Sequence, residues 1–305
     1  MGDVVIKKQV GILGATSLVG CCLLPQLKAA GYQVKAFSRK ISRRGLNDIT
    51  RDDATGDYIN WQQLPLSTCN FTIKSGAATP YWICVAPIWV LPHYFELLEK
   101  YGVRRVIVLS STSRFSKSKS SDLKEQSVAQ RLADSESCVK TWAENKSIEW
   151  VILRPTLIYG FGRDKNITEI ARIIRRFGFF PLLGKAMGLR QPVHSEDVAG
   201  ACVAALDSSS VVNHEYNISG GEILTYREMI VRVFVAMERP IRMLPVPLWV
   251  FRGLVALLRL IPRYRLWSAA MVERMNNDLL FDHSEAAHDF DFNPRGFVLT
   301  AEDVS

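Results

Sequence analysis

The first residues whose spacing suggests chemistry are glycines near the N-terminus. The segment Gly11-Ile-Leu-Gly14-Ala-Thr-Ser17-Leu-Val-Gly20 follows an apolar run and precedes residues with helical spacing. Glycines permit a tight turn and leave backbone N–H groups open to a phosphate pair, and the positive end of the following helix favours its charge. A structural turn without ligand is the alternative. The segment predicts a dinucleotide site with contacts from Gly14, Ala15, Thr16, Ser17, Leu18, Val19 and Gly20.

The residues after the second apolar run indicate which dinucleotide binds. An acidic residue there would accept a hydrogen bond from the ribose 2′-hydroxyl, whereas arginine pairs with a 2′-phosphate. This chain has Ser38, Arg39 and Lys40 at that place, followed by Arg43 and Arg44. A solvated basic loop is the alternative. We predict that NADP(H) is favoured over NAD(H), with Ser38, Arg39 and Lys40 as contacts.

Alternating elements must position these residues. Apolar runs predict strands, and stretches with apolar residues three and four apart predict helices between them. The alternation predicts a parallel, doubly wound sheet with right-handed crossovers. The polar run Arg114–Gln126 predicts a mobile surface loop. The expected strands are Val4–Leu13, Tyr32–Phe37, Trp82–Val85, Val103–Leu109 and Trp150–Leu153, and the expected helices are Leu18–Ala30, His93–Tyr101 and Gln126–Asn145.

After Pro155 the pattern becomes less regular, with helices expected over Ile167–Phe177, Ser195–Leu206 and Thr225–Met237. The predicted fold class is therefore α/β, a Rossmann-type doubly wound parallel sheet with a smaller C-terminal substrate-binding region. Residues 1–158 should form the NAD(P)-binding domain, and residues 190–220 should return to it. Residues 159–305 should mainly form the smaller region.

Several motifs in this order resemble a known superfamily. The pattern over residues 4–240 is similar to extended short-chain dehydrogenases/reductases, and within them to the NAD-dependent epimerase/dehydratase family. The resemblance implies an NAD(P)-dependent oxidoreductase or epimerase, with further cofactor contacts at Ala86, Ser110 and Pro155. The motifs are the Gly-Ala-Thr-x-x-x-Gly loop, Leu109–Thr112, Leu153–Gly160, Pro192–Ala199 and Tyr216–Gly221.

The resemblance also implies a catalytic Ser or Thr and a Tyr-x-x-x-Lys pair. A tyrosine acts as a base near neutral pH only if neighbouring positive charge lowers its pKa, which the lysine supplies. Thr112 matches the first position. Counted back from Glu136, the pair's positions hold Val128 and Leu132, and no tyrosine in the chain has a lysine four residues later. Either another residue transfers the proton, or hydride chemistry is absent.

Other residues of the chain offer replacements for the missing base. Tyr159 ends the Leu-Ile-Tyr segment near the expected substrate pocket, although a tyrosine packed beside the sheet is the more common arrangement. Lys117 and Lys119 follow Thr112 and could reach the nicotinamide, although solvated loop lysines are more common. The predicted catalytic residues are therefore Thr112 and Tyr159.

The residues expected at the substrate pocket point to different classes of substrate. Arg190 resembles the family arginine that grips the diphosphate of a nucleotide sugar, and a guanidinium suits that task because it pairs with phosphate oxygens bidentately. Leu157, however, stands where the family often has an asparagine. We predict a small-molecule substrate of the phosphorylated or nucleotide-linked kind, with an apolar or lipid-linked substrate as the competing hypothesis.

Composition excludes several classes. The net charge of +8 comes from scattered residues without a basic stripe or reading motif, so no nucleic-acid binding is expected. The six cysteines form no Cys-x-x-Cys pair, which predicts reduced thiols and no metal site. The N-terminus leads directly into an apolar strand without a secretory signal, so a cytoplasmic protein is expected.

The segment Leu244–Ile261 is strongly apolar but contains Arg252 and Arg259. Two arginines near its middle are costly in hydrocarbon, so we reject a membrane-spanning helix. A helix packed on its own domain is favoured. The alternative is peripheral contact of residues 244–261 with a membrane or a protein partner. A homodimer is also expected.

Two functions from different classes remain. The first is an enzyme of the family with non-standard acid–base residues, which Thr112 and Arg190 favour. The second is a redox-silent NADP(H)-binding accessory or regulatory protein, similar to the nucleotide-binding accessory subunit of respiratory complex I, which the missing Tyr-x-x-x-Lys favours. A sensor that binds NADP(H) and a protein partner is a variant of the second. The first is our prediction.

The basic residues after the second strand generate a test of cofactor choice. NADPH should bind more tightly than NADH, and Arg39→Asp should reverse that order because a carboxylate repels the 2′-phosphate and accepts from a free 2′-hydroxyl. Titration of both nucleotides by calorimetry measures it. Equal affinities in the unchanged protein would contradict the assignment.

Overall fold

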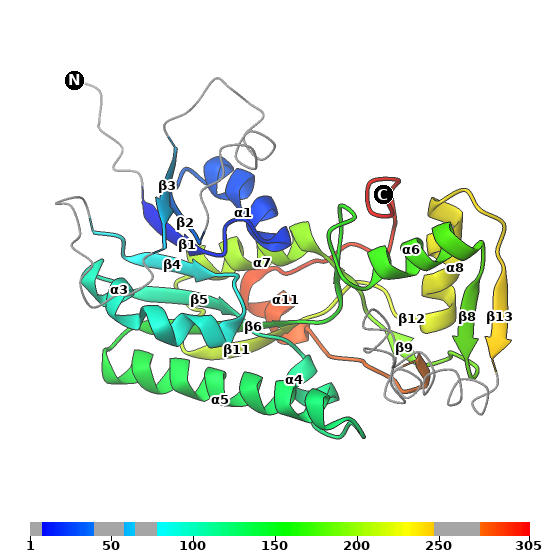
Figure 1. The fold of residues 1–305 in the computed structure, drawn as a ribbon. Coiled ribbons are helices and arrows are strands. Elements are labelled where there is room, and N and C mark those ends of the chain that lie inside the picture. The colour runs from blue at the N-terminus through cyan, green and yellow to red at the C-terminus, as the bar shows by residue number, and fades with distance from the viewer. Residues whose placement is uncertain (1–7, 40–57, 65–77, 247–274) are drawn as a thin grey trace.

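A computed structural model describes residues 8–39, 58–64, 78–246 and 275–305. Its centre is a seven-stranded sheet with the strand order β11-β6-β5-β4-β1-β2-β3 (Figure 1). All six pairings in this sheet are parallel. The predicted α/β class with a doubly wound parallel sheet is therefore confirmed.

The strand order reverses next to β1. From β1 the chain proceeds to β2 and β3 on one side, and then returns to build β4, β5, β6 and β11 on the other. In sheets of this type, ligands bind in the crevice beyond the carboxyl ends of the strands, at the point where the strand order reverses. The bounds are β1 Gln9–Leu13, β2 Gln33–Ser38, β3 Ile59–Gln63, β4 Tyr81–Cys84, β5 Arg105–Leu109, β6 Glu149–Pro155 and β11 His214–Ile218.

Helices cover both faces of the sheet (Figure 1). One face carries α1 (Leu18–Ala29) and α7 (Ser195–Asp207), and the other carries η1 (Ile88–Tyr94), α3 (Phe95–Lys100) and α5 (Leu123–Asn145). Every residue of β5 is buried, and because successive strand residues point to opposite faces, Val106 and Val108 lie in one apolar cluster and Ile107 and Leu109 in the other.

Hydrogen bonds continue past the strand ends at the carboxyl edge. The Leu13 carbonyl accepts from the amides of Val85 and Ala86 at 2.9 and 3.1 Å. The Ser110 amide donates to Leu153 at 2.8 Å. The loops after β1, β4 and β5 are thus fixed to their neighbouring strands where they leave the sheet.

A smaller region lies beyond β6, to the right in Figure 1. It contains α6 (Ile167–Phe177), β8 (Phe180–Leu183), α8 (Tyr226–Ala236) and β13 (Met243–Val246), with β8 and β13 paired. Two short pairs, β7 (Ile158–Tyr159) with β10 (Val193–His194) and β9 (Leu189–Arg190) with β12 (Leu224–Thr225), join it to the sheet. The last helix, α11 (Ser284–Phe290), packs against β11.

Two local predictions were wrong. The segment Arg114–Gln126 is not one loop, because it contains most of α4 (Ser113–Ser116) and the start of α5. Asp122 caps α5 by accepting from the Lys124 amide at 2.9 Å, so the helix begins before the apolar pattern does. The helix predicted from His93 begins only at Phe95, because His93 and Tyr94 belong to the 3₁₀ helix η1, which also contains Pro92.

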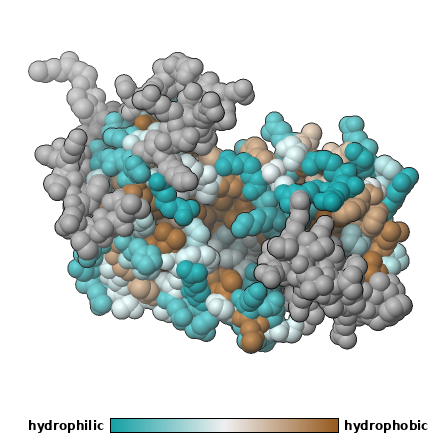
Figure 2. All heavy atoms as spheres, in the orientation of Figure 1, coloured by the Kyte–Doolittle hydropathy of each residue, from teal (hydrophilic) through white to brown (hydrophobic). Residues whose placement is uncertain are grey.

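Parts of the chain lie outside the described residues. These include Lys40, Arg43, Arg44, Cys69 and residues 247–261 of the apolar segment. Among the helices that the structure describes, none combines the length and apolarity needed to cross a membrane. Among the coloured atoms of Figure 2, apolar patches lie between hydrophilic residues.

Arg105 at the start of β5 is a buried cation that joins the sheet to α7. Its Nη2 donates to the carbonyls of Ala205 and Ser208 at 2.8 and 2.6 Å and to that of Val211 at 2.5 Å. Its Nη1 lies 3.3 Å from Glu149. A guanidinium at the C-terminal end of a helix satisfies carbonyls that the helix leaves unpaired.

Replacing this cation tests its role in stability. Arg105→Met should lower the free energy of unfolding by about 3 kcal/mol, because it leaves buried carbonyls without a donor. Urea unfolding followed by circular dichroism measures the change. Arg104→Met is the matched control, since Arg104 is adjacent and exposed. Equal stabilities of the two variants would contradict this account.

Candidate functional site

The glycine loop between β1 and α1 has a backbone that requires its glycines. Gly14 has φ +91°, and a Cβ there would lie 2.6 Å from the Ala86 nitrogen. A Cβ on Gly20 would lie 2.4 Å from the Gly14 carbonyl oxygen. The first glycine therefore lets the turn pack on the end of β4, and the last lets α1 pack on the turn. The sequence predicted a tight turn here, and the structure adds that the glycines also allow this packing.

The first turn of α1 is suited to an anion. Ser17 caps the helix, and its Oγ accepts from the Gly20 amide at 3.1 Å. The amides of Leu18 and Val19 come earlier in the turn, where a helix has no internal partner for them. No acidic residue occupies this turn, so no carboxylate of its own neutralises the positive end of the helix. The loop thus fits the diphosphate of a dinucleotide.

The other predicted cofactor residues lie along the same edge of the sheet. Ala86 follows β4, Ser110 follows β5, and Pro155 ends β6. Ser38 ends β2 and is buried, and Arg39 follows it and is exposed. The structure therefore brings the predicted residues that it describes to one edge of the sheet.

Thr112 lies at the same edge and is held against β6. Its amide donates to the Pro155 carbonyl at 3.1 Å, and its hydroxyl lies 3.2 Å from the same oxygen. The side chain is only 5% exposed. A hydroxyl has one proton, so Thr112 can donate either to Pro155 or to a substrate oxygen.

The two helix positions at which the family pattern has tyrosine and lysine carry apolar side chains that pack against the core. Leu132 is 4% exposed and belongs to the apolar cluster beneath α5, and Val128 packs against that cluster. Neither side chain can exchange a proton. The apolar packing explains how the helix accommodates the absence of tyrosine and lysine without leaving a void.

Glu136, one turn beyond Leu132, is the centre of a buried ion cluster. Its side chain is fully buried and accepts from Ser110 Oγ at 2.5 Å and from Arg154 Nη2 at 2.7 Å. Arg114 from α4 forms a second ion pair with it. Two arginines therefore balance the charge of this buried carboxylate, which lies one helical turn beyond the position of the missing lysine.

Tyr159 is buried inside the smaller region rather than open to a substrate. It is fully buried, and its ring packs edge-on against His194 and Phe297 with centroids 5.1 and 4.9 Å away. Burial, with Asp303 adding to it, raises the pKa of its hydroxyl far above the usual value. This placement argues against Tyr159 as the base and favours the packed tyrosine that we considered as the alternative.

Arg190 is directed into the protein. It is 4% exposed, and its Nη1 donates to the carbonyls of Leu189 and Asn277 at 2.6 and 2.7 Å. The guanidinium also lies 5.5 Å from the ring centre of Tyr226. Binding of a diphosphate by Arg190 therefore requires it to exchange these internal partners for phosphate oxygens.

Side chains that the sequence did not single out gather at the far end of this edge. Ser219 follows β11, and its Oγ donates to the Phe281 carbonyl at 2.8 Å and lies 2.6 Å from His283 Nδ1. The Phe281 ring lies 6.1 Å from that of Phe115 on α4. Distant segments meet here, and no local sequence pattern indicates such a contact.

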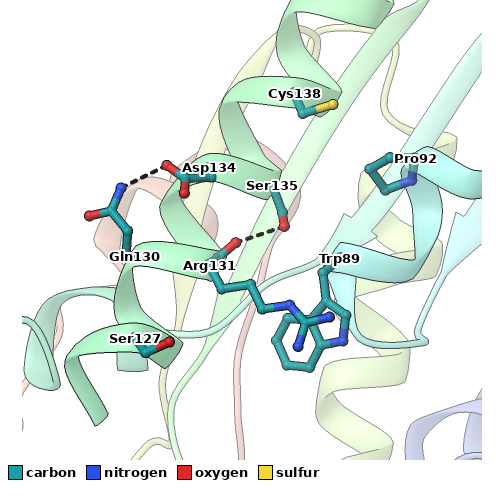
Figure 3. Close-up of a pocket in the computed structure, with 8 residues that line it drawn as sticks. All are labelled: Trp89, Pro92, Ser127, Gln130, Arg131, Asp134, Ser135 and Cys138. Carbon is teal, nitrogen blue, oxygen red and sulfur yellow. Dashed lines mark hydrogen bonds between the residues drawn. The ribbon is translucent and has the colours of Figure 1, made fainter. Parts of the chain in front are cut away.

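A groove of about 550 Å³ runs along the outer face of α5 beside η1 (Figure 3). Arg131 covers the Trp89 ring at 4.5 Å from its centre. Three other polar side chains of the groove are hydrogen-bonded within α5, Gln130 to Asp134 at 2.7 Å and Ser135 to the Arg131 carbonyl at 2.7 Å. Because these side chains already have partners, we do not assign the groove a ligand.

Comparison with known proteins shows which proteins this chain resembles. The model of the NAD dependent epimerase/dehydratase family matches residues 93–219. UDP-glucose 4-epimerase of Vibrio cholerae is 23% identical over 99% of this chain and 97% of its own length. The crystal structure of UDP-glucuronic acid 4-epimerase from Bacillus cereus with NAD has a TM-score of 0.68 at 13% identity, over 97% of this chain and 95% of that one.

A shorter match involves the mitochondrial NADH dehydrogenase [ubiquinone] 1 alpha subcomplex subunit 9 of Arabidopsis thaliana. It is 34% identical over 27% of this chain and 20% of that protein. The fold is similar to that of the solved Bacillus cereus epimerase. The predicted resemblance to the NAD-dependent epimerase/dehydratase family, an enzyme family, is confirmed.

The Gly14 geometry generates a test of the loop. Gly14→Ala should weaken dinucleotide binding at least tenfold, because the methyl group collides with the backbone of β4 and displaces the loop. Fluorescence titration with NADPH and NADH measures the effect. Gly31→Ala is the matched control, because Gly31 also has a positive φ, +78°, but open space around it. Equal binding by both variants would contradict the assignment.

Proposed function

We propose that this chain is an NAD(P)-dependent enzyme of the epimerase or oxidoreductase type that acts on a nucleotide-linked sugar without the Tyr-x-x-x-Lys pair. The observation that carries the proposal is the meeting of the Gly14–Gly20 loop and the Thr112 hydroxyl at one sheet edge. Thr112 is fixed there by Pro155 at 3.1 Å through its amide. Ligands of open α/β sheets bind at this edge.

The cofactor in this proposal supplies the hydride chemistry when it is bound. The residues of this chain that would hold it are the Gly14–Gly20 loop, with Ser38 and Arg39 at the ribose of the adenosine. The solved relative from Bacillus cereus is named in complex with NAD. Arg39 is exposed and stands where a site for NAD(H) would have an acidic residue, which supports NADP(H) as the preferred cofactor.

Proton transfer must use groups other than positions 128 and 132. Thr112 is proposed to hydrogen-bond the reacting oxygen, since a positioned donor stabilises charge that develops there. Arg114 supplies positive charge beside Glu136 where the lysine is absent. Two side chains are candidates, His283, which lies 2.6 Å from Ser219 just after β11, and Lys117, which follows α4.

The substrate class follows from the relatives and from Arg190. Both full-length relatives are named for sugars linked to UDP. Arg190 can pair with a diphosphate after releasing the Leu189 and Asn277 carbonyls. The proposal also includes the boundary between the two regions of the chain at residues 158 and 159. It further includes a homodimer and a cytoplasmic location, which can be tested without measuring activity.

A redox-silent NADP(H)-binding protein is the second candidate. The burial of Leu132 favours it, because the helix position of the missing lysine is sealed in apolar core. The short match to a respiratory complex subunit supports the same alternative. Incubation with NADPH, NADP and a panel of nucleotide sugars separates the two, since only the enzyme converts a sugar or changes absorbance at the nicotinamide.

Thr112 provides the test of catalysis. Thr112→Ala should lower turnover by about a hundredfold and leave NADP(H) affinity within about twofold, because the hydroxyl acts on the substrate and the loop holds the phosphates. Steady-state kinetics and calorimetry measure the two effects.

Thr112→Ser is the matched variant, since it retains the hydroxyl and should retain most of the turnover. A protein that binds NADPH, yet shows no turnover with any nucleotide sugar before or after these changes, would favour the redox-silent alternative.

A further inference from the structure

Arg163 reaches the cofactor loop from a distant part of the chain. It lies between β7 and α6 and is exposed. Its Nη2 donates to the Thr16 carbonyl at 3.2 Å, and its Nη1 lies 3.1 Å from Cys21 Sγ. Thr16 belongs to the loop and Cys21 to the first turns of α1. The guanidinium is thus placed beside the N-terminal end of this helix.

This placement of a cation is electrostatically unusual. The N-terminal end of a helix carries partial positive charge, which repels cations and attracts anions. The neighbouring Asp164 does not compensate, since its Oδ1 accepts from the amides of Asn166 and Ile167 at 2.7 and 2.6 Å. In the part of the chain that the structure describes, Arg163 has no carboxylate partner, only a carbonyl and a thiol. The positive guanidinium thus lies beside the positive end of α1.

The segment that carries Arg163 is fixed by packing on both sides. Gly160 has φ +140°, and a Cβ there would lie 2.7 Å from Ser195 Oγ. The amide of Phe161 donates to Asp303 Oδ1 at 2.8 Å. Gly162, φ +60°, lies against Ser305, where a Cβ would be 2.6 Å from its Oγ. These contacts direct the arginine toward the loop, so its position is not that of a free surface side chain.

We propose that Arg163 binds the diphosphate of the dinucleotide at the N-terminus of α1. The proposal rests on the proposed cofactor site and adds a residue from outside the glycine loop. A guanidinium can pair with two phosphate oxygens at once, and the helix amides can bind the others. On binding, Arg163 exchanges the Thr16 carbonyl for a phosphate oxygen. The anion then lies between the two positive groups.

The test measures binding, so it needs no catalytic activity. Arg163→Gln, Arg163→Lys and the unchanged protein are titrated with NADPH and with ADP-ribose, which both contain the diphosphate. Adenosine, which lacks it, is measured by displacement of NADPH. Arg163→Gln should weaken NADPH and ADP-ribose by about tenfold to a hundredfold and leave adenosine unchanged, because a charged hydrogen bond is lost only to phosphate. Arg163→Lys should bind with intermediate affinity.

Arg172→Gln is the matched control. Arg172 is an exposed arginine of α6 that pairs with Glu169, away from the loop. Its removal should leave every affinity unchanged. The melting temperature of each variant is measured in parallel, since Arg163 also joins two segments of the fold.

The outcomes separate this inference from the proposed function. Normal binding of NADPH and ADP-ribose by Arg163→Gln would overturn the inference and leave the cofactor site in place. Parallel loss of adenosine and ADP-ribose with a lower melting temperature would also overturn it, in favour of a structural role. If the unchanged protein binds no dinucleotide, the proposed function itself is wrong.

Discussion

The packing at the carboxyl ends of the strands depends on one buried side chain, the carboxylate of Glu136. Glu136 is fully buried, and a buried charge is tolerated only when it is paired and hydrogen-bonded. Its partners come from three other elements, Ser110 after β5, Arg154 on β6 and Arg114 on α4. Arg154 continues to Glu215 on β11 at 3.2 Å. One ion cluster therefore fixes the ends of three strands against α5.

The same cluster sets the electrostatics of the proposed catalytic position. Burial alone would raise the pKa of the Glu215 carboxyl, but Lys140 and Arg154 outweigh it and lower the pKa. The positive charge of Arg114 is held at Glu136, one helical turn beyond Leu132, where the family pattern has a lysine. Thr112 lies at the same edge of the sheet, whereas positions 128 and 132 carry apolar side chains that cannot exchange a proton. That difference is why an enzyme and a redox-silent protein both fit the fold, and why binding and turnover have to be measured separately.

The C-terminal segment connects the two parts of the molecule. Arg295 pairs with Glu196 and Asp197 at 2.9 Å, and so attaches this segment to the start of α7. Asp303 binds the segment before Arg163, and Phe281 lies beside Phe115. The surroundings of the cofactor loop and of Thr112 therefore depend on residues near the end of the chain, which lie far from the glycine loop in sequence.

Local sequence determined the elements of this protein that depend on periodicity and on glycine. The Gly14–Gly20 turn, the alternation of strands and helices and the stripe of α6 follow from neighbouring residues, because turn dihedrals and helical spacing are local properties. The structure confirmed the fold class on that basis. Even so, the start of α5 escaped prediction, since the capping residue Asp122 precedes the apolar pattern.

Tertiary structure alone decided what the polar side chains do. Tyr159, Arg190 and Arg163 were comparable in sequence, each polar and near a family motif. Packing buries Tyr159 against Phe297. It directs Arg190 to the Asn277 carbonyl and brings Arg163 to the Thr16 carbonyl. The partners are more than 80 residues away along the chain, so no local pattern encodes the contacts. Their roles depend on which segments the fold places together.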